Sequence, residues 1–330
     1  MESSTLKKIA ESLGLSISTV SRALKNHPDI SANTRQKVVD LAQALDYEPN
    51  ANAVHLRTRN SKLLGVLVPS ISNYFYESFI SSIEEEGRKN GYSVLILQSG
   101  NEPEVESENL KLFRQNRIIG LFACISSQTK DFSGFAKMDD LETPVIFFDN
   151  IPNLNAIHSV CLADTQAGIM AAETIILKKK RQVWAVFGDK QLSITQKRLR
   201  SFLETFHKLA PATQVQPVFA ISSEEARNHT NHLLLSPNQP DTIFCMSDEI
   251  LMGVMKSLQE NKVSIPEQMA VIAISNGLIP KLYHPEITYV ETSGYKLGKL
   301  AFVKMMSCLS EKIVQGESIL ESVLVEGGSL

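Results

Sequence analysis

Three side chains near the N-terminus have the types and spacing needed to read the edges of DNA bases. Ile17, Ser18 and Arg22 fall in a short predicted helix, on the side left exposed by its apolar residues. An arginine there can donate two hydrogen bonds to the O6 and N7 atoms of one guanine, which discriminates against other bases by about 1–3 kcal/mol. Because such a helix fits the major groove, these residues predict sequence-specific DNA binding.

The residues around this helix have the spacing that two crossed helices require. Ala10 is small where the helices would cross, Gly14 falls in a turn that calls for a positive φ, and Val20 would fill the space between the helices. Ser16 and Ser31 are suitable N-caps for a second and a third helix. The pattern predicts a helix-turn-helix head. The alternative is a generic three-helix bundle with solvated serine and arginine side chains.

A second DNA-contacting element is predicted directly after the head. Pro49 interrupts the helical pattern, small residues follow, and Leu56 stands beside Arg57 and Arg59. We interpret this segment as a short hinge helix around Ala53 that lies in the minor groove and wedges Leu56 between base pairs. The alternative interpretation is a plain interdomain linker.

Charge and composition fit a small DNA module on a larger soluble body. Residues 1–60 carry a net charge of +2 and the remainder a net charge of −5. No apolar stretch approaches the length of a membrane span, and the first residues lack the apolar core of a signal peptide. The four cysteines lie far apart, as expected of reduced thiols in a cytoplasmic protein, and no residue spacing indicates a metal or cofactor.

From Leu63 onward, short apolar runs alternate with amphipathic helices, which predicts an α/β body of parallel sheets covered on both faces. The length allows two such units side by side, with a ligand at the carboxyl ends of the strands. The predicted strands are 63–68, 92–97, 118–124, 145–148, 183–187, 242–245 and 269–274, and the predicted helices include 74–90, 104–116, 165–177, 195–209 and 247–261.

The whole chain to about residue 325 resembles the lactose-repressor (LacI/GalR) family of bacterial regulators. The head motif is specific: it runs over residues 5–24 and continues through 27–31, 34–35 and 47–58. The motifs of the body are looser but occur in family order, at 72–75, 85–92, 119–121, 144–145, 164–168, 198–202, 247–248, 252–253 and 265–266.

The resemblance implies three parts: a head (1–48), a hinge (49–61) and a two-lobed ligand-binding and dimerisation body (62–330) of the periplasmic-binding-protein type. Lobe 1 would span about 62–160 plus 292–318, and lobe 2 about 161–291 plus 319–330. A homodimer would place two heads on a palindromic, double-stranded operator, with Ile17, Ser18 and Arg22 on bases and Leu56 intercalated. Positions that match phosphate contacts are Thr5, Ser16, Thr19, Ser21, Asn26 and Thr34.

The resemblance also implies a small-molecule cleft between the lobes. The matching positions are Tyr74, Phe75, Asp149, Ser193, Arg198, Ser247, Asp248 and Ser275. Two positions depart from the family: Ser275 replaces a hydroxyl-binding aspartate found in many relatives, and Ile221 replaces the aromatic residue of purine binders. Three of these residues also have a structural interpretation in place of ligand binding. Phe75 could be a core residue, Arg198 a surface residue and Asp248 the cap of a helix.

The predicted function is therefore a transcriptional repressor whose operator affinity is set by a small effector, for which the family resemblance implies a carbohydrate or a related metabolite. Three alternatives stay open at this level. An enzyme would need a phosphate loop, a nucleophile elbow or a metal cluster, and the sequence has none of these motifs. A solute-binding protein fits the body but not the head. An activator or mixed regulator would have the same sequence features as a repressor.

Overall fold

The computed structural model describes residues 6–47, 61–154, 157–310 and 316–330. The chain divides into two compact units, residues 1–61 and 62–330. Within the described ranges, no helix has both the length and the apolar character needed to cross a membrane.

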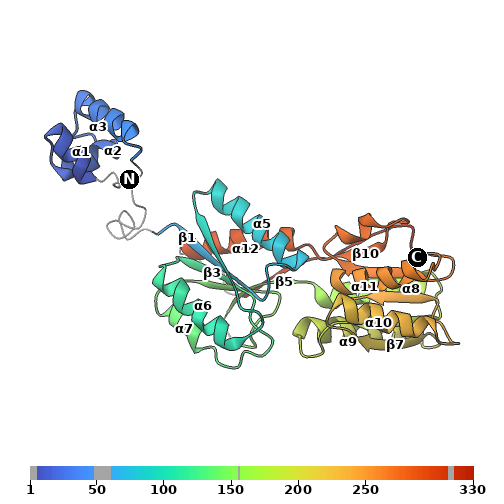
Figure 1. The fold of residues 1–330 in the computed structure, drawn as a ribbon. Helices are drawn as coiled ribbons and strands as arrows, with labels where there is room; N and C mark the ends of the chain where they lie inside the picture. The colour runs from blue at the N-terminus through green and yellow to red at the C-terminus, as the bar shows by residue number, and fades with distance from the viewer. Residues whose placement is uncertain (1–5, 48–60, 155–156, 311–315) are drawn as a thin grey trace. The chain divides into compact units, whose positions relative to one another are not determined.

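The first unit is a bundle of three helices, α1 (Leu6–Leu13), α2 (Ile17–Leu24) and α3 (Ala32–Ala44), drawn in blue in Figure 1. Gly14, between α1 and α2, has a φ of +62°, which confirms the predicted turn. Ser16 and Ser31 cap α2 and α3 by accepting hydrogen bonds from the backbone N–H groups of Thr19 and Thr34. The core consists of Ile9, Ala10, Val20, Ala23, Val38 and Ala42.

The first lobe of the second unit contains a six-stranded sheet in the order β11-β5-β4-β3-β1-β2, with all its pairs parallel. Helices α5 and α12 cover one face and α6 and α7 the other (Figure 1). The strands are β1 (Leu63–Val68), β2 (Ser93–Gln98), β3 (Gly120–Ala123), β4 (Val145–Phe148), β5 (His158–Leu162) and β11 (Gly316–Leu320). The helices are α5 (Tyr74–Lys89), α6 (Pro103–Gln115), α7 (Ser133–Asp139) and α12 (Gly294–Leu309).

The second lobe repeats this architecture with the sheet order β12-β10-β9-β8-β6-β7, in which only the β10–β12 pair is antiparallel. Helices α8 and α9 pack together, as do α10 and α11. The strands are β6 (Gln182–Phe187), β7 (Gln214–Phe219), β8 (Thr242–Cys245), β9 (Ala270–Ser275), β10 (Thr288–Glu291) and β12 (Val323–Val325). The helices are α8 (Asp164–Leu177), α9 (Ser193–Leu209), α10 (Ser223–Leu234), α11 (Asp248–Glu260) and the short 3-10 turn η1 (Ile279–Leu282).

The chain crosses between the two sheets three times: after β5, after β10 and between β11 and β12. The fold class is as predicted. The first lobe extends two residues further than predicted at both β5 and β11. Five strands were not predicted from sequence, namely β5, β7, β10, β11 and β12. The edge strand β7 shows why, because half of its residues are exposed polar ones or proline and its apolar signal is therefore weak.

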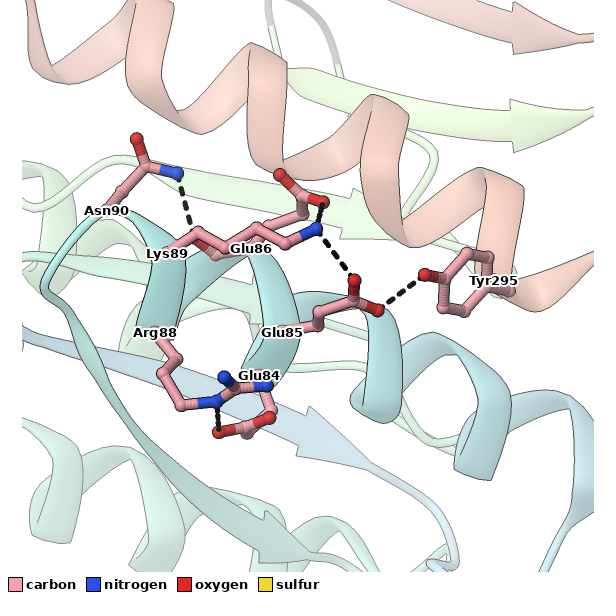
Figure 2. A network of polar contacts seen from close by, with 7 residues as sticks. All are labelled: Glu84, Glu85, Glu86, Arg88, Lys89, Asn90 and Tyr295. Carbon is pink, nitrogen blue, oxygen red and sulfur yellow. Dashed lines mark hydrogen bonds and ion pairs between the residues drawn. The ribbon is translucent and has the colours of Figure 1, made fainter.

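Helices α5 and α12 lie unusually close together. A Cβ atom on Gly294 would lie 2.3 Å from the carbonyl oxygen of Phe75, and one on Gly298 would lie 2.9 Å from that of Phe79. Farther along the pair, Glu85 of α5 accepts hydrogen bonds from Tyr295 of α12 at 2.5 Å and from Lys89 at 2.6 Å (Figure 2). These contacts fix the two helices against each other at the sheet face.

This network predicts an acid dependence of stability. The hydrogen bond from Lys89, and then that from Tyr295, lower the pKa of Glu85 from 4.5 to about 2. A lowered pKa stabilises the folded state above the unfolded value, and this contribution is lost as the pH falls from 4.5 toward 2. We expect Glu85→Gln to reduce the difference in denaturation midpoint between pH 7 and pH 3. Glu84→Gln breaks only a surface pair with Arg88 and is the control; an equal effect of both variants contradicts the prediction.

Candidate functional site

The exposed face of α2 carries the three residues predicted to read bases. Ile17 is 50% exposed although it is a large apolar side chain, and Ser18 and Arg22 are exposed beside it. Ser18 and Arg22 are four residues apart and so share one face of the helix. Val20 and Ala23 point the other way, into the head. The structure therefore brings the three predicted base-reading side chains together on one surface.

The predicted phosphate-contacting residues lie in different surroundings. The hydroxyl of Ser16 lies 2.7 Å from that of Ser18 and 2.8 Å from that of Thr19, so the N-terminus of α2 presents three adjacent hydroxyls. Asn26 is exposed with a φ of +57° after α2, and the hydroxyl of Thr34 accepts a hydrogen bond from Ser31. Ser21 is only 6% exposed, which makes it a poorer phosphate contact than the others. Thr5, Ala53 and Leu56 lie outside the described residues.

A cleft of about 320 Å³ lies between the two lobes of the body, within the size range of small-molecule sites. It lies beyond the carboxyl ends of β1, β4, β8 and β9, where ligands bind in parallel sheets. Seven of the eight predicted ligand-binding residues line it: Tyr74, Phe75, Asp149, Arg198, Ser247, Asp248 and Ser275. The eighth, Ser193, is the first residue of α9 and is not among the lining residues.

Eight further residues that line the cleft were not predicted from the sequence: Ser72, Asn73, Leu162, Glu249, Met252, Ile274, Asn276 and Thr292. Ser72 and Asn73 belong to a motif already noted for its resemblance, and Asn73 caps α5 by accepting from the N–H of Phe75 at 2.9 Å. Asn276 and Thr292 follow β9 and β10, so the rule that ligands bind at carboxyl ends of strands could have found them.

Arg198 lines the cleft from α9 and is only 3% exposed. The alternative that Arg198 is a surface residue is therefore wrong. Its Nε and Nη2 atoms donate to the Asp164 carboxylate at 2.8 and 2.7 Å, and its Nη1 donates to the carbonyl oxygen of Met246 at 3.1 Å. The helices α8 and α9 approach closely at Gly168, where a Cβ atom would lie 2.7 Å from the carbonyl oxygen of Arg198. This close approach brings Asp164 and Arg198 into a buried ion pair.

Asp149 directly follows β4 and has a φ of +59°. Its Oδ2 atom accepts a hydrogen bond from the Tyr76 hydroxyl at 2.7 Å, and the thiol of Cys124 lies 3.8 Å from the same oxygen. No hydrogen bond to Oδ1 occurs among the described residues. Burial raises the pKa of this carboxyl, and the Tyr76 hydrogen bond only partly opposes that shift. The second oxygen is therefore an available acceptor for a ligand.

Asp248 does not cap its own helix, because Ser247 occupies the N-cap position of α11 and accepts from the N–H of Ile250. Instead, its Oδ1 accepts from the Ser275 hydroxyl and its Oδ2 accepts from the N–H of Asn276 at 2.9 Å. The Ser275 hydroxyl also accepts from the N–H of Gly277, and the residue is 2% exposed. Ser275 therefore supports Asp248 and has little capacity left for a ligand.

The two aromatic residues at the mouth of the cleft differ in exposure. Tyr74 is exposed, whereas Phe75 is half-buried, packs against the core of the first lobe and meets the ring of Tyr76 edge-on at 5.7 Å. Phe75 thus has both a packing role and a face toward the cleft. Groups of three or more His, Cys, Asp or Glu side chains arranged to hold a metal ion do not occur within the described ranges.

Two family models match this chain. Residues 61–322 match the periplasmic binding proteins and sugar binding domain of the LacI family, and residues 5–50 match the bacterial regulatory proteins of the lacI family. The chain belongs to the LacI family. It is a DNA-binding regulator with an effector-binding body, as the residues of the head and the cleft predicted.

Curated LacI-family relatives span nearly the whole chain. The HTH-type transcriptional repressor PurR of Actinobacillus pleuropneumoniae serotype 3 is 25% identical over 313 residues, covering 94% of this chain and 91% of PurR. The ribose operon repressor of Bacillus subtilis is 26% identical over 310 residues, covering 93% and 92%. Both relatives are named as repressors.

Solved structures show the same fold. A lac repressor dimer bound to operator and the anti-inducer ONPF superposes with a TM-score of 0.87 at 20% identity, covering 99% of each chain. The Cra transcriptional dual regulator of Pseudomonas putida, in complex with fructose 1-phosphate, gives a TM-score of 0.72 at 21% identity and covers 81% of this chain and 99% of its own.

Proposed function

We propose that this LacI-family protein is a transcriptional repressor, that it binds a palindromic operator as a homodimer, and that an uncharged or cationic metabolite in the cleft controls its operator affinity. The observation that supports control by an effector is that residues of both lobes line the same cleft. A ligand there changes DNA binding only if it favours one arrangement of the lobes over another. The separation of the two hinge segments, 49–61, would then decide whether Leu56 stays in the minor groove.

The charge of the cleft supports a ligand without an anionic group. Asp149, Asp248 and Glu249 line it, against one cation, Arg198, whose charge is already matched by Asp164. A phosphate or carboxylate would meet uncompensated like charge at close range. Hydroxyl or ammonium groups would instead donate to the free oxygen of Asp149. The Cra structure contains a phosphorylated sugar, so this property separates the present chain from at least one protein of the same fold.

The effector class is tested by thermal shift with matched pairs of neutral sugars, the same sugars as phosphates or uronates, and amino sugars. A ligand at about 100 times its dissociation constant should stabilise the body by about 2.7 kcal/mol. We expect the stabilising compounds to be neutral or cationic, and a hit that is anionic contradicts this proposal. The hit is then titrated against operator binding measured by fluorescence anisotropy.

Effector affinity should also depend on pH. Burial raises the pKa of both Asp149 and Asp248 above the ordinary aspartate value, so acid protonates them earlier than an exposed carboxyl. Protonation replaces an acceptor by a donor, and we expect the dissociation constant of a hydroxyl-rich effector to increase as the pH falls from 7.5 to 5. Calorimetric titration at several pH values measures it, and Asp149→Asn should flatten the profile. A profile that stays the same in Asp149→Asn contradicts the role of this carboxylate.

We further propose that the protein acts in the cytoplasm and has no catalytic activity. The DNA-reading face of α2 supports the first point, since an operator is a cytoplasmic partner in bacteria. The composition of the cleft supports the second, because the Arg198 guanidinium and the Asp248 carboxylate are both held by hydrogen bonds within the protein. Incubation of the effector with the protein should return it unchanged, and turnover would contradict this proposal.

A further inference from the structure

Asn276 is a side chain of the second lobe that makes hydrogen bonds to two helices of the first. Its Oδ1 atom accepts from the backbone N–H of Gly294 at 2.8 Å and from the Ser78 hydroxyl at 3.2 Å. Its Nδ2 atom donates to the carbonyl oxygen of Tyr74 at 3.3 Å. Gly294 begins α12, and Tyr74 and Ser78 lie in the first turns of α5. The amide thus lies where two helices of one lobe meet the end of β9 in the other.

The two helices offer little room to rearrange at this point. The Cα of Gly294 packs so closely on the carbonyl oxygen of Phe75 that any larger side chain there would overlap it. The N-termini of α5 and α12 therefore act as one rigid surface toward Asn276. Breaking the bridge requires the second lobe to move or the Asn276 side chain to turn away.

The backbone that carries Asn276 is fixed by a residue of the cleft. Both oxygens of the Asp248 carboxylate hold the turn after β9, one by accepting from Ser275 and the other from the N–H of Asn276. Asp248 makes no hydrogen bond to the first lobe among the described residues. Each oxygen already accepts one hydrogen bond from this turn, so a ligand donor that reaches either oxygen shares that acceptor and weakens its hold on the turn.

We infer that Asp248 is a positioning residue that couples ligand occupancy to lobe closure through Asn276. Asn276 forms the bridge between the lobes, and Asp248 keeps its backbone in the bridging position. A ligand group at Asp248 changes the bridge without touching the first lobe. This inference rests on the proposed function of the cleft, but its structural core, the dependence of the bridge on Asp248, is testable on the free protein.

The test is hydrogen–deuterium exchange of the Gly294 amide in the full chain without ligand. Asn276→Ala removes the acceptor, and we expect exchange at Gly294 to accelerate at least tenfold. In Asp248→Asn the side chain no longer has a carboxylate oxygen for each of its two donors, Ser275 and the N–H of Asn276. We expect the exchange rate of the Gly294 amide to increase in this variant, although residue 248 does not contact that amide. Ser275→Ala is a milder variant that removes one donor and should give a smaller rise. In the double variant N276A/D248N the exchange rate of the Gly294 amide should not exceed that of N276A alone.

Asn231→Ala is the matched control. The side chain of Asn231 accepts from Ser257 at 2.7 Å and from Asn261 at 3.0 Å, all within the second lobe. It should leave Gly294 exchange unchanged. If Asn276→Ala leaves the exchange unchanged, or Asn231→Ala raises it equally, the bridge is overturned. If Asp248→Asn and Ser275→Ala both leave it unchanged, the positioning role is overturned. None of these results depends on whether an effector or an operator has been found.

Discussion

Replacing Arg198 with methionine is expected to lower the free energy of unfolding by about 3–5 kcal/mol, because it leaves the buried carboxylate of Asp164 without its partner. Both side chains are almost inaccessible, so water cannot take over the role of the guanidinium. The loss also removes the hydrogen bond to the carbonyl oxygen of Met246 at the cleft wall. Effector binding should be lost together with stability.

The measurement is chemical denaturation followed by tryptophan fluorescence. Trp184 is the only tryptophan and lies in the core of the second lobe, so its signal reports the unfolding of the lobe that contains the pair. Arg200→Met is the matched control, because Arg200 lies on the same helix but pairs with Glu204 in solvent, and it should change stability by less than about 1 kcal/mol. Equal losses from R198M and R200M would falsify the buried-pair argument.

A double variant separates structure from binding. Replacing both charges, as in D164L/R198M, removes the unpaired carboxylate and should recover most of the stability that R198M loses. It restores no donor in the cleft, so effector affinity should stay low. Recovery of binding in the double variant would show that Arg198 contributes to the site only through folding.

The fully buried strands of the two lobes could be predicted from the sequence, whereas most of the strands at the edges of the sheets could not. The strand β1 reads Leu-Leu-Gly-Val-Leu-Val and is buried on both faces, which gives a continuous apolar run. The strand β7 carries Gln214, Gln216 and Pro217 because it forms the outer edge of its sheet. The pattern of apolar residues in a sequence reflects which positions are buried. A half-exposed strand has too few apolar residues to be recognised from that pattern.

Most residues of the site could be predicted from their type and from their neighbours in the sequence, but the contacts between them could not. The resemblance implies a ligand contact at Ser193, yet Ser193 lies five helical positions before Arg198, which turns its side chain by about 140° to another face of α9. The pairing of Arg198 with Asp164 joins residues on two different helices, and the bridge from Asn276 to Tyr74 of α5 spans 202 residues. Such contacts are set by tertiary packing, which a local pattern does not contain.

The second large effect is expected at the DNA-reading face. Arg22→Ala should weaken binding to the specific operator by about 1–3 kcal/mol, roughly five- to 150-fold, because the exposed side chain would lose a bidentate contact with a guanine. Binding to a scrambled duplex should change far less, since it depends mainly on phosphate contacts. The operator is first obtained by selection from a random duplex library, and both affinities are measured by anisotropy at one salt concentration.

The variant Arg22→Lys decides whether geometry or charge carries the effect. Lysine keeps the positive charge but lacks the planar fork that matches one guanine edge, so most of the specific affinity should still be lost. The dependence of binding on salt should remain close to that of the wild type, because the number of phosphate contacts is unchanged. If lysine restores full affinity, or if alanine weakens scrambled DNA as much as the operator, then Arg22 contacts the backbone. In that case sequence discrimination by α2 would have to come from its remaining exposed residues, Ile17 and Ser18.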